Sequence, residues 1–307
     1  MASDKAQELL ALSRTLEWDF PSSAGRPLRT PDPQLLERRH DFPAAARALD
    51  AESATELAAN TWRLWMAARD ISGGRAFLAE VLDAGDAEPT AARAIALYGD
   101  GLFAFWEGAR GACRGRNEDA LEVAQTTADE QALVLAHLGL SRALLDDGDY
   151  TAAGEHATAA RGGAARFGDA MEQGALHMHA QATRLAGDYD AAAGLFAESL
   201  ALNRRLDAQG MVDVELHNLG HVEVHRGNVG AAERYFSETT YADDEYGEAM
   251  RRLNDAAIAF LRGDLESAGS SLDAAEAAFA GSAMEAAAVD DRFELEWLRD
   301  QLTCAAS

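Results

Sequence analysis

The chain has 307 residues, with 27 Lys+Arg against 52 Asp+Glu, and a formal net charge of −25 at pH 7. This acid excess repels polyanions, so we expect neither nucleic acid nor an anionic membrane surface as a partner. Hydrophobic residues make up 48% and charged residues 26% of the chain, and two cysteines are present. These values are typical of a globular protein and argue against a disordered, fibrous or disulfide-scaffold class.

The N-terminal segment predicts a short amphipathic helix, assigned to residues 1–19, with three leucines on one side. It has no basic start followed by an apolar run, as a signal peptide would, and no run of 18 apolar residues occurs anywhere in the chain. We therefore expect a cytoplasmic protein without a membrane span. Residues 20–33 are rich in proline and predict a linker.

The rest of the chain carries an internal repeat and has no proline after Pro89. Four turn glycines share the same surroundings: a small residue seven positions before, an Asp or Asn directly after, and an alanine five positions after. They are Gly148, Gly187, Gly227 and Gly263, spaced 39, 40 and 36 residues apart. Glycine ends a helix in the left-handed conformation, and Asp or Asn caps the next one. Weaker copies surround Gly108 and cover about residues 54–82.

This pattern resembles tetratricopeptide repeats, some of them lengthened to about 40 residues. We accordingly expect an all-α, right-handed solenoid of five to six helical hairpins over residues 34–282, and a capping helix over residues 283–307. The final helix should turn Phe293 and Trp297 inward. A narrower resemblance, in the stretches NTWRLW from Asn60 and GGRAFLAEVL from Gly73, is to the repeat region of large bacterial LuxR- and SARP-type ATPase regulators. No P-loop or helix-turn-helix segment accompanies it, so ATP hydrolysis and DNA binding do not carry over.

The resemblance implies that the first helix of each hairpin lines a concave groove that binds ligands. Counting back from each turn glycine identifies the groove positions. The candidate ligand-binding residues are Tyr98, Phe105, Trp106, Arg142, His177, Gln181, Arg184, His217, Asn218, His221 and His225. Repeats of this type that bind C-terminal carboxylates use lysines, which are absent from the groove positions here, so that only Arg142 and Arg184 could substitute for them.

The series His217-x3-His221-x3-His225 is the most unusual feature of these positions. Residues four apart drift by about 40° around a helix, so the three imidazoles span about 80° of one face. Neighbouring leucines supply the packing surface of this helix, so the histidines are not needed for the core. His177 stands 40 residues before His217, and we expect it on the adjacent helix, roughly 10 Å away between axes. No acidic residue occupies an aligned groove position beside them.

Three interpretations of the histidines stay open. They are polar residues of a solvated groove, or they hydrogen-bond a peptide or a small polar or aromatic molecule, with the aromatic residues stacking at one end. Alternatively His177, His217 and His221 bind a transition metal, because imidazoles at i and i+4 converge on one ion. The motifs GxSxG, HExxH and GxGxxG are absent.

We therefore expect a non-catalytic module that binds a peptide, a partner protein segment or a small molecule, in a regulatory or adaptor role and without a cofactor. The alternative is an enzyme or metal-binding protein that acts on or sequesters a small natural product. In that case His217, His221 and His177 would serve as bases or ligands.

Overall fold

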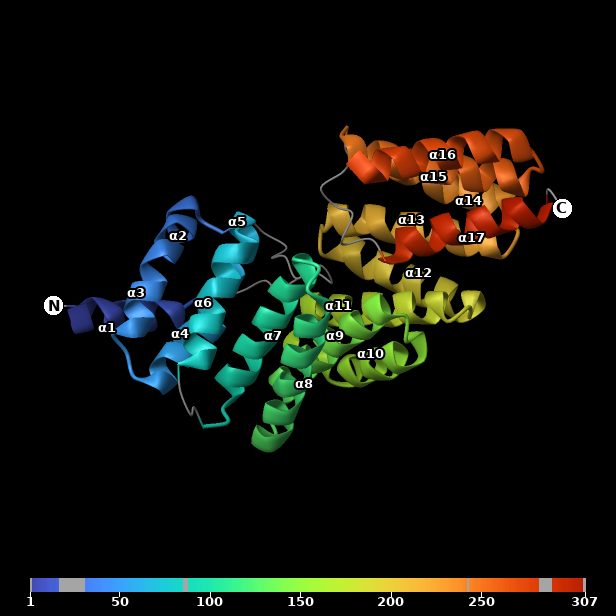
Figure 1. Cartoon of the computed structure of the whole chain (residues 1–307). Helices are drawn as coiled ribbons and strands as arrows, with labels where there is room; N and C mark the ends of the chain where they lie inside the picture. The colour runs from blue at the N-terminus through green and yellow to red at the C-terminus, as the bar shows by residue number, and fades with distance from the viewer. Residues whose placement is uncertain (1, 17–30, 85–87, 242, 282–288, 306–307) are drawn as a thin grey trace. The chain divides into compact units, whose positions relative to one another are not determined.

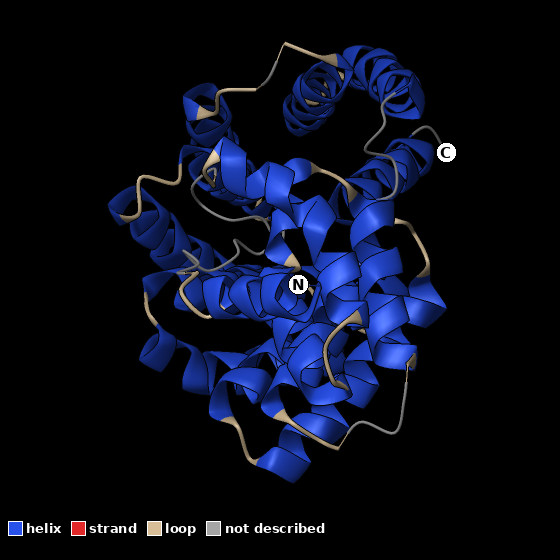
Figure 2. Cartoon of the chain, turned by 90° about the vertical axis from the view of Figure 1, so that its left-hand side faces the viewer, coloured by secondary structure: helices blue, strands red, loops and turns tan. Residues whose placement is uncertain are grey.

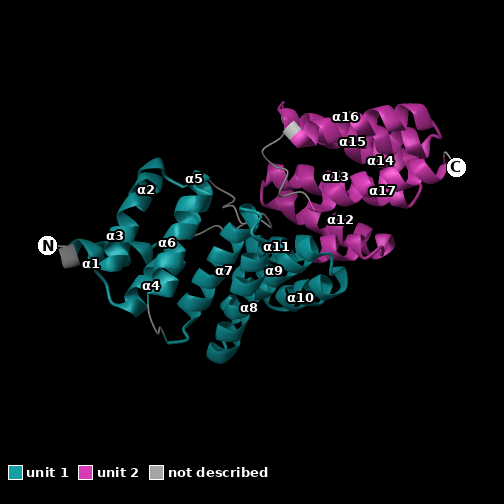
Figure 3. Cartoon of the chain, viewed as in Figure 1, with its two compact units in different colours: residues 1–178 teal, residues 179–307 magenta. Residues whose placement is uncertain are grey.

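The computed structural model describes residues 2–16, 31–84, 88–241, 243–281 and 289–305, and these parts of the chain contain helices but no strand (Figures 1 and 2). The chain forms two compact units, residues 1–178 and 179–307 (Figure 3). No helix in the described ranges combines the length and apolar composition needed to cross a membrane.

The first unit begins with short helices and continues with long hairpins. Its helices are α1 (Ala2–Ser13), α2 (Pro33–Arg38), η1 (Arg39–Asp41), α3 (Phe42–Arg47), α4 (Ala51–Thr61), α5 (Arg63–Ala68), α6 (Ile71–Asp83), α7 (Ala91–Trp106), α8 (Arg110–Thr127), α9 (Glu130–Asp147), α10 (Tyr150–Ala164) and η2 (Ala165–Phe167). Helix α1 packs against α3 and α4. Helix α1 covers residues 2–13 of the segment predicted as an N-terminal helix, and most of the predicted linker lies outside the described residues.

Helix α11 (Asp169–Leu185) contains the boundary between the units. The second unit continues with α12 (Tyr189–Arg205), α13 (Gln209–His225), α14 (Val229–Glu238), α15 (Glu245–Leu261), α16 (Leu265–Gly281) and α17 (Val289–Ala305). Neighbouring helices pack against one another from α7 to α10 in the first unit, and in the second unit α12 with α13, α13 with α14 and α15 with α16, as the repeat predicts (Figure 1). The C-terminal helix occupies residues 289–305 of the predicted capping segment.

The turns between paired helices have the backbone geometry that the repeat predicts. Each turn glycine adopts a positive φ, between 70° and 88°, a conformation that costs glycine little. The aspartates after Gly148 and Gly187 cap the next helix, accepting hydrogen bonds from the backbone N–H three residues on at 3.1 Å. Asn228 departs from this pattern, because its side-chain amide donates to Glu223 instead of capping α14.

The small residues in the first helices let the paired backbones approach closely. At Gly220 in α13, a Cβ atom would lie 2.1 Å from the Phe236 ring of α14, which is impossible without a shift. Phe196 and Leu272, the residues four positions after the repeat alanines of α12 and α16, are completely buried. Each hairpin thus buries its apolar side against its neighbours, which is how a solenoid builds a continuous core.

Helix α14 is shorter than the other second helices of the hairpins. It ends at Glu238 after 10 residues, whereas α12 and α16 each have 17. Its contact with α15 is correspondingly limited. The repeat pattern predicts where helices turn but does not reveal this early end of α14.

Candidate functional site

In the first unit, the structure groups three of the predicted ligand residues. The guanidinium of Arg142 lies 5.7 Å from the centre of the Phe105 ring, and Phe105 meets Trp106 edge-on at 5.7 Å. Tyr98 instead lies in the core, 1% exposed, with its ring 5.8 Å from that of Trp62. His177 is buried as well.

The remaining candidates lie on α11 and α13 in the second unit. Leu216 and Leu219 of α13 pack into the core formed with α12, so the helix turns its series of histidines in another direction. We name Gln181, Arg184, His217, His221 and His225 the histidine face. These five side chains are buried, which does not agree with the interpretation of the histidines as polar residues of a solvated groove. The reason for their burial is the C-terminal helix α17.

Glu294 of α17 binds three members of the histidine face. Its carboxylate lies 3.0 Å from the Arg184 guanidinium, and both side chains are 1% exposed. The same carboxylate accepts a hydrogen bond from Nε2 of His225 at 2.9 Å and lies 3.4 Å from Nδ1 of His221. A buried carboxylate needs partners of this kind, since an unpaired charge in the interior costs several kcal/mol.

Two aspartates of α17 bind the rest of the face. Asp290 accepts a hydrogen bond from the Gln181 amide at 2.8 Å. Asp291 lies 3.5 Å from Nε2 of His217 and accepts a 2.9 Å hydrogen bond from the Tyr246 hydroxyl on α15. Three carboxylates of α17 thus contact polar side chains from three other helices, α11, α13 and α15.

Burial sets the protonation of this cluster. It lowers the pKa of His221 to about 4, so this imidazole is neutral at pH 7. Burial would raise the pKa of Glu294, but its close contacts with His221, His225 and Arg184 outweigh burial and hold this pKa well below its usual value. Burial and the nearby charge of Asp290 raise the pKa of Asp291. Glu294 is therefore the permanent negative charge that matches Arg184.

Aromatic rings enclose the end of the histidine face. His225 stacks on Tyr189, with ring centres 4.3 Å apart and planes 6° apart, and Trp297 of α17 lies 4.2 Å from it on ring centres. Phe293 also packs against His225, at 5.9 Å. Phe293 and Trp297 thus face inward as predicted. Such rings exclude water from the ionic contacts and strengthen them.

Acidic residues reach the histidines from outside the aligned groove positions. The aligned groove positions contain none, but α17 brings Asp291 and Glu294 to them from far along the chain. Among the residues the structure describes, no group of three or more His, Cys, Asp or Glu side chains is arranged to hold a metal ion. The other ring nitrogens of His217 and His221 bond to Tyr241 and Asn254, respectively, each at 3.1 Å.

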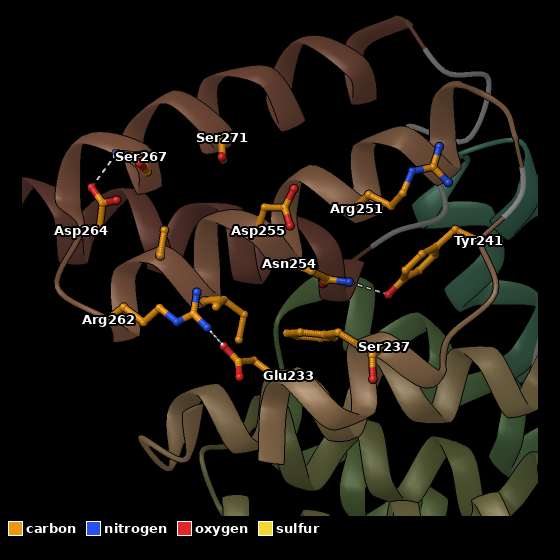
Figure 4. A pocket seen from close by; sticks show the side chains of 13 residues that line it. Glu233, Ser237, Tyr241, Arg251, Asn254, Asp255, Arg262, Asp264, Ser267 and Ser271 are labelled. Carbon is orange, nitrogen blue, oxygen red and sulfur yellow. Dashed lines mark hydrogen bonds and ion pairs between the residues drawn. The ribbon is translucent and has the colours of Figure 1, made fainter. Parts of the chain in front are cut away.

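Beside these bonds a pocket of about 640 Å³ opens between α14, α15 and α16 (Figure 4). Tyr241 and Asn254 point toward one another at its wall, where the Asn254 amide donates to the Tyr241 hydroxyl at 2.5 Å. Arg262 and Glu233 form an ion pair on another side. Tyr241 and Asn254 thus separate this open pocket from the buried histidine face.

Asn218, the last predicted residue, lies on α13 next to His217 and is completely buried. Neither its side-chain nitrogen nor its oxygen has a hydrogen-bond partner within the described ranges. Each such group costs about 1–3 kcal/mol relative to a satisfied one. Groups of this kind call for a specific explanation, such as a bound molecule or a role in function.

The fold places the chain in a known structural class. No protein-family model and no curated protein sequence matches it. Solved structures do match. A Rap protein complexed with competence and sporulation factor is 12% identical with a TM-score of 0.57, covering 97% of this chain and 80% of that one. NprR in complex with its cognate peptide NprX is 15% identical with a TM-score of 0.59, covering 86% and 80%.

A tetratricopeptide repeat protein from Parabacteroides merdae ATCC 43184 matches over 98% of this chain and 99% of its own, at 13% identity and a TM-score of 0.51. Together with the sequential hairpins, these matches show an all-α fold of the tetratricopeptide-like solenoid class.

Proposed function

We propose that the chain is a non-catalytic regulatory module that binds a peptide or partner segment through the histidine face. The observation that carries this proposal is the contact with α17, in which buried donors from α11, α13 and α15 hold a helix by its carboxylates. A surface that binds a helix from its own chain has the shape and the hydrogen-bonding groups to bind one from elsewhere. Three of these donors, Gln181, Arg184 and His225, are groove residues that the repeat register predicts.

Two further features support a binding role. Asn218 offers a buried amide without a partner in the described structure, next to the face. The matching NprR structure contains a cognate peptide, and the matching Rap structure a bound factor. A regulatory role also agrees with the resemblance of the stretches at Asn60 and Gly73 to repeat regions of bacterial regulators.

The test is selection of 12-residue peptides from a random display library against the full chain. Selected peptides should lose affinity by about tenfold or more in Arg184→Lys, which keeps the charge but not the planar fork, and in His217→Gln. The control is Arg166→Gln, which removes an exposed ion pair with Glu130 in the first unit. Failure to select any peptide, or equal affinity for all these proteins, would contradict the proposal.

A further inference from the structure

Helix α17 buries charge where a terminal helix ordinarily buries apolar surface. Its fully buried residues are Asp291, Glu294 and Leu298, so two of the three are carboxylic acids. Burying ionic groups adds little net stability compared with apolar packing, but it selects strongly for a partner with matching groups. The contact between α17 and the histidine face is therefore built for recognition more than for stability.

The spacing of these contacts defines what the histidine face recognises. Asp290, Asp291 and Glu294 occupy positions i, i+1 and i+4, which fall within an arc of about 100° around a helix. Phe293 and Trp297 flank the same side and pack against His225. The pattern Asp-Asp-x-Phe-Glu-x-x-Trp thus presents three acceptors and two rings to the donors in a single helical register.

We propose, building on the function above, that the ligand of the histidine face is an acidic, aromatic helix of a partner protein. Helix α17 is then a resident competitor that carries the same pattern. Charge complementarity supports this ligand: the Arg184 guanidinium can only donate, the Gln181 amide N–H donates to Asp290, and the imidazole nitrogens that face α17 meet carboxylates. A ligand without acids would leave the Arg184 charge buried and unpaired.

The net charge of −25 opposes the approach of any acidic ligand. This repulsion acts between exposed charges and is screened over about 10 Å at 0.1 M salt. The contacts at the face are buried and screened much less. Association should therefore speed up as salt rises, while dissociation stays nearly constant, which is the reverse of the behaviour of a ligand attracted by the acidic surface.

Helix α17 is covalently linked to the histidine face, and this link determines how well a free helix can compete with it. Residues 282–288 join it to α16, and so short a link gives an effective concentration in the millimolar range. A free helix with the same contacts therefore binds the wild-type chain poorly unless its own affinity is higher or α17 is weakened. The experiment must weaken α17 without touching the face.

The probe is a fluorescein-labelled synthetic peptide of residues 289–305 carrying Cys304→Ser, measured by anisotropy. The control peptide carries Asp290→Asn, Asp291→Asn and Glu294→Gln in addition. The proteins are the full wild-type chain, the full chain with Asp291→Asn and Glu294→Gln, and the full chain with Glu296→Gln, which alters an exposed acid of the same helix. Thermal unfolding checks that each one folds.

The acidic peptide should bind the Asp291→Asn/Glu294→Gln chain about tenfold or more tighter than it binds the wild type or Glu296→Gln. The control peptide should bind that chain about tenfold or more weaker than the acidic peptide does. In the wild type, a saturating amount of acidic peptide should speed amide hydrogen exchange across α17. This last measurement needs no folded variant and decides the question if the double variant is unstable.

Equal binding of the two peptides, or unchanged exchange in α17 at saturation, would overturn the inference. If library-selected peptides bind through Arg184 and His217 while the acidic peptide does not, the inference about ligand class fails and the proposed function stands. If neither kind of peptide binds, both fail.

Discussion

The Arg184 guanidinium and the Glu294 carboxylate form a completely buried ion pair, 3.0 Å apart, between residues separated by 110 positions in the chain. The pair joins α17 to the end of α11 through charge. Substitution of one partner of the ion pair should therefore affect stability differently from substitution of both partners. An orphaned buried charge is costly, whereas replacement of both partners by apolar residues is often neutral.

We expect Glu294→Gln to lower the free energy of unfolding by about 3 kcal/mol or more, because it leaves the Arg184 charge buried without a full counter-charge. Urea unfolding of the full chain measures this loss. Glu296→Gln on the exposed side of α17 should change it by less than about 0.5 kcal/mol. If the two variants lose equal stability, the ion pair does not hold α17.

A second variant separates charge from packing at this position. Arg184→Met combined with Glu294→Leu should recover most of the stability that Glu294→Gln loses. The recovered chain should nevertheless fail to bind acidic peptides. A double variant that remains as unstable as the single one would show that the loss arises from altered packing.

The protonation of His221 predicts how stability depends on pH. Its pKa of about 4 in the folded chain lies below the value of about 6.5 in the unfolded chain. As pH falls below 6.5 the unfolded chain binds a proton that the folded chain does not, so stability falls, by up to about 2 kcal/mol between pH 6.5 and pH 5. Glu294 adds a loss in the same direction only below its unfolded pKa, near 4.5.

Urea unfolding at a series of pH values from 7.5 to 5 checks this dependence. Burial also lowers the pKa values of His137 and His156, so these two histidines also make the chain less stable as the pH falls. The His221→Gln chain should therefore show a flatter pH dependence and not a flat one. His40→Gln, at an exposed position, should keep the full dependence. An unchanged slope in His221→Gln would mean that the pKa of this imidazole does not differ between the folded and the unfolded chain.

The helical hairpins could be predicted because their signals are local. A glycine such as Gly187 and the aspartate after it determine the turn between adjacent helices. These two residue types alone therefore predict where the helices end. The histidine face could be predicted for the same reason, since one register places its members. Tyr98 followed the register equally well, but neighbouring rings such as Trp62 draw it into the core.

The role of α17 could not be predicted from local pattern. Its contacts with α13 join residues about 70 positions apart, such as His225 and Glu294, and no repeat unit encodes that return. One signal was nevertheless present. Acids at 290, 291 and 294 share a helical side with Phe293 and Trp297, so this side is mixed where a simple capping helix would be apolar. A mixed side of this kind predicts a polar counterpart.

Gly220 is expected to tolerate no side chain. A Cβ there would lie 2.1 Å from the Phe236 ring, so Gly220→Ala should lower stability by about 1–3 kcal/mol despite the better helix propensity of alanine. Gly230→Ala in α14, where a Cβ meets nothing within 4 Å, should be neutral or slightly stabilising. Combining Gly220→Ala with Phe236→Leu should restore part of the loss. Equal stability of the two alanine variants would contradict the close approach of α13 and α14.

Leucine variants of Asn218 and Asn254 can be compared to distinguish an effect on ligand binding from an effect on stability. Asn254 bonds to His221 and Tyr241, whereas the buried Asn218 amide has no partner in the described structure. Asn218→Leu should therefore raise the free energy of unfolding by about 1 kcal/mol, and Asn254→Leu should lower it by about 1–3 kcal/mol.

If Asn218 serves ligand binding, its leucine variant should be more stable and yet bind selected peptides more weakly, since binding sites commonly sacrifice stability for function. Urea unfolding and fluorescence anisotropy on the same samples measure both quantities. A loss of stability in Asn218→Leu would mean that an ordered water satisfies the amide. Unchanged peptide affinity in Asn218→Leu would mean that Asn218 is not part of the binding site. The binding site would then consist only of the side chains that hold α17.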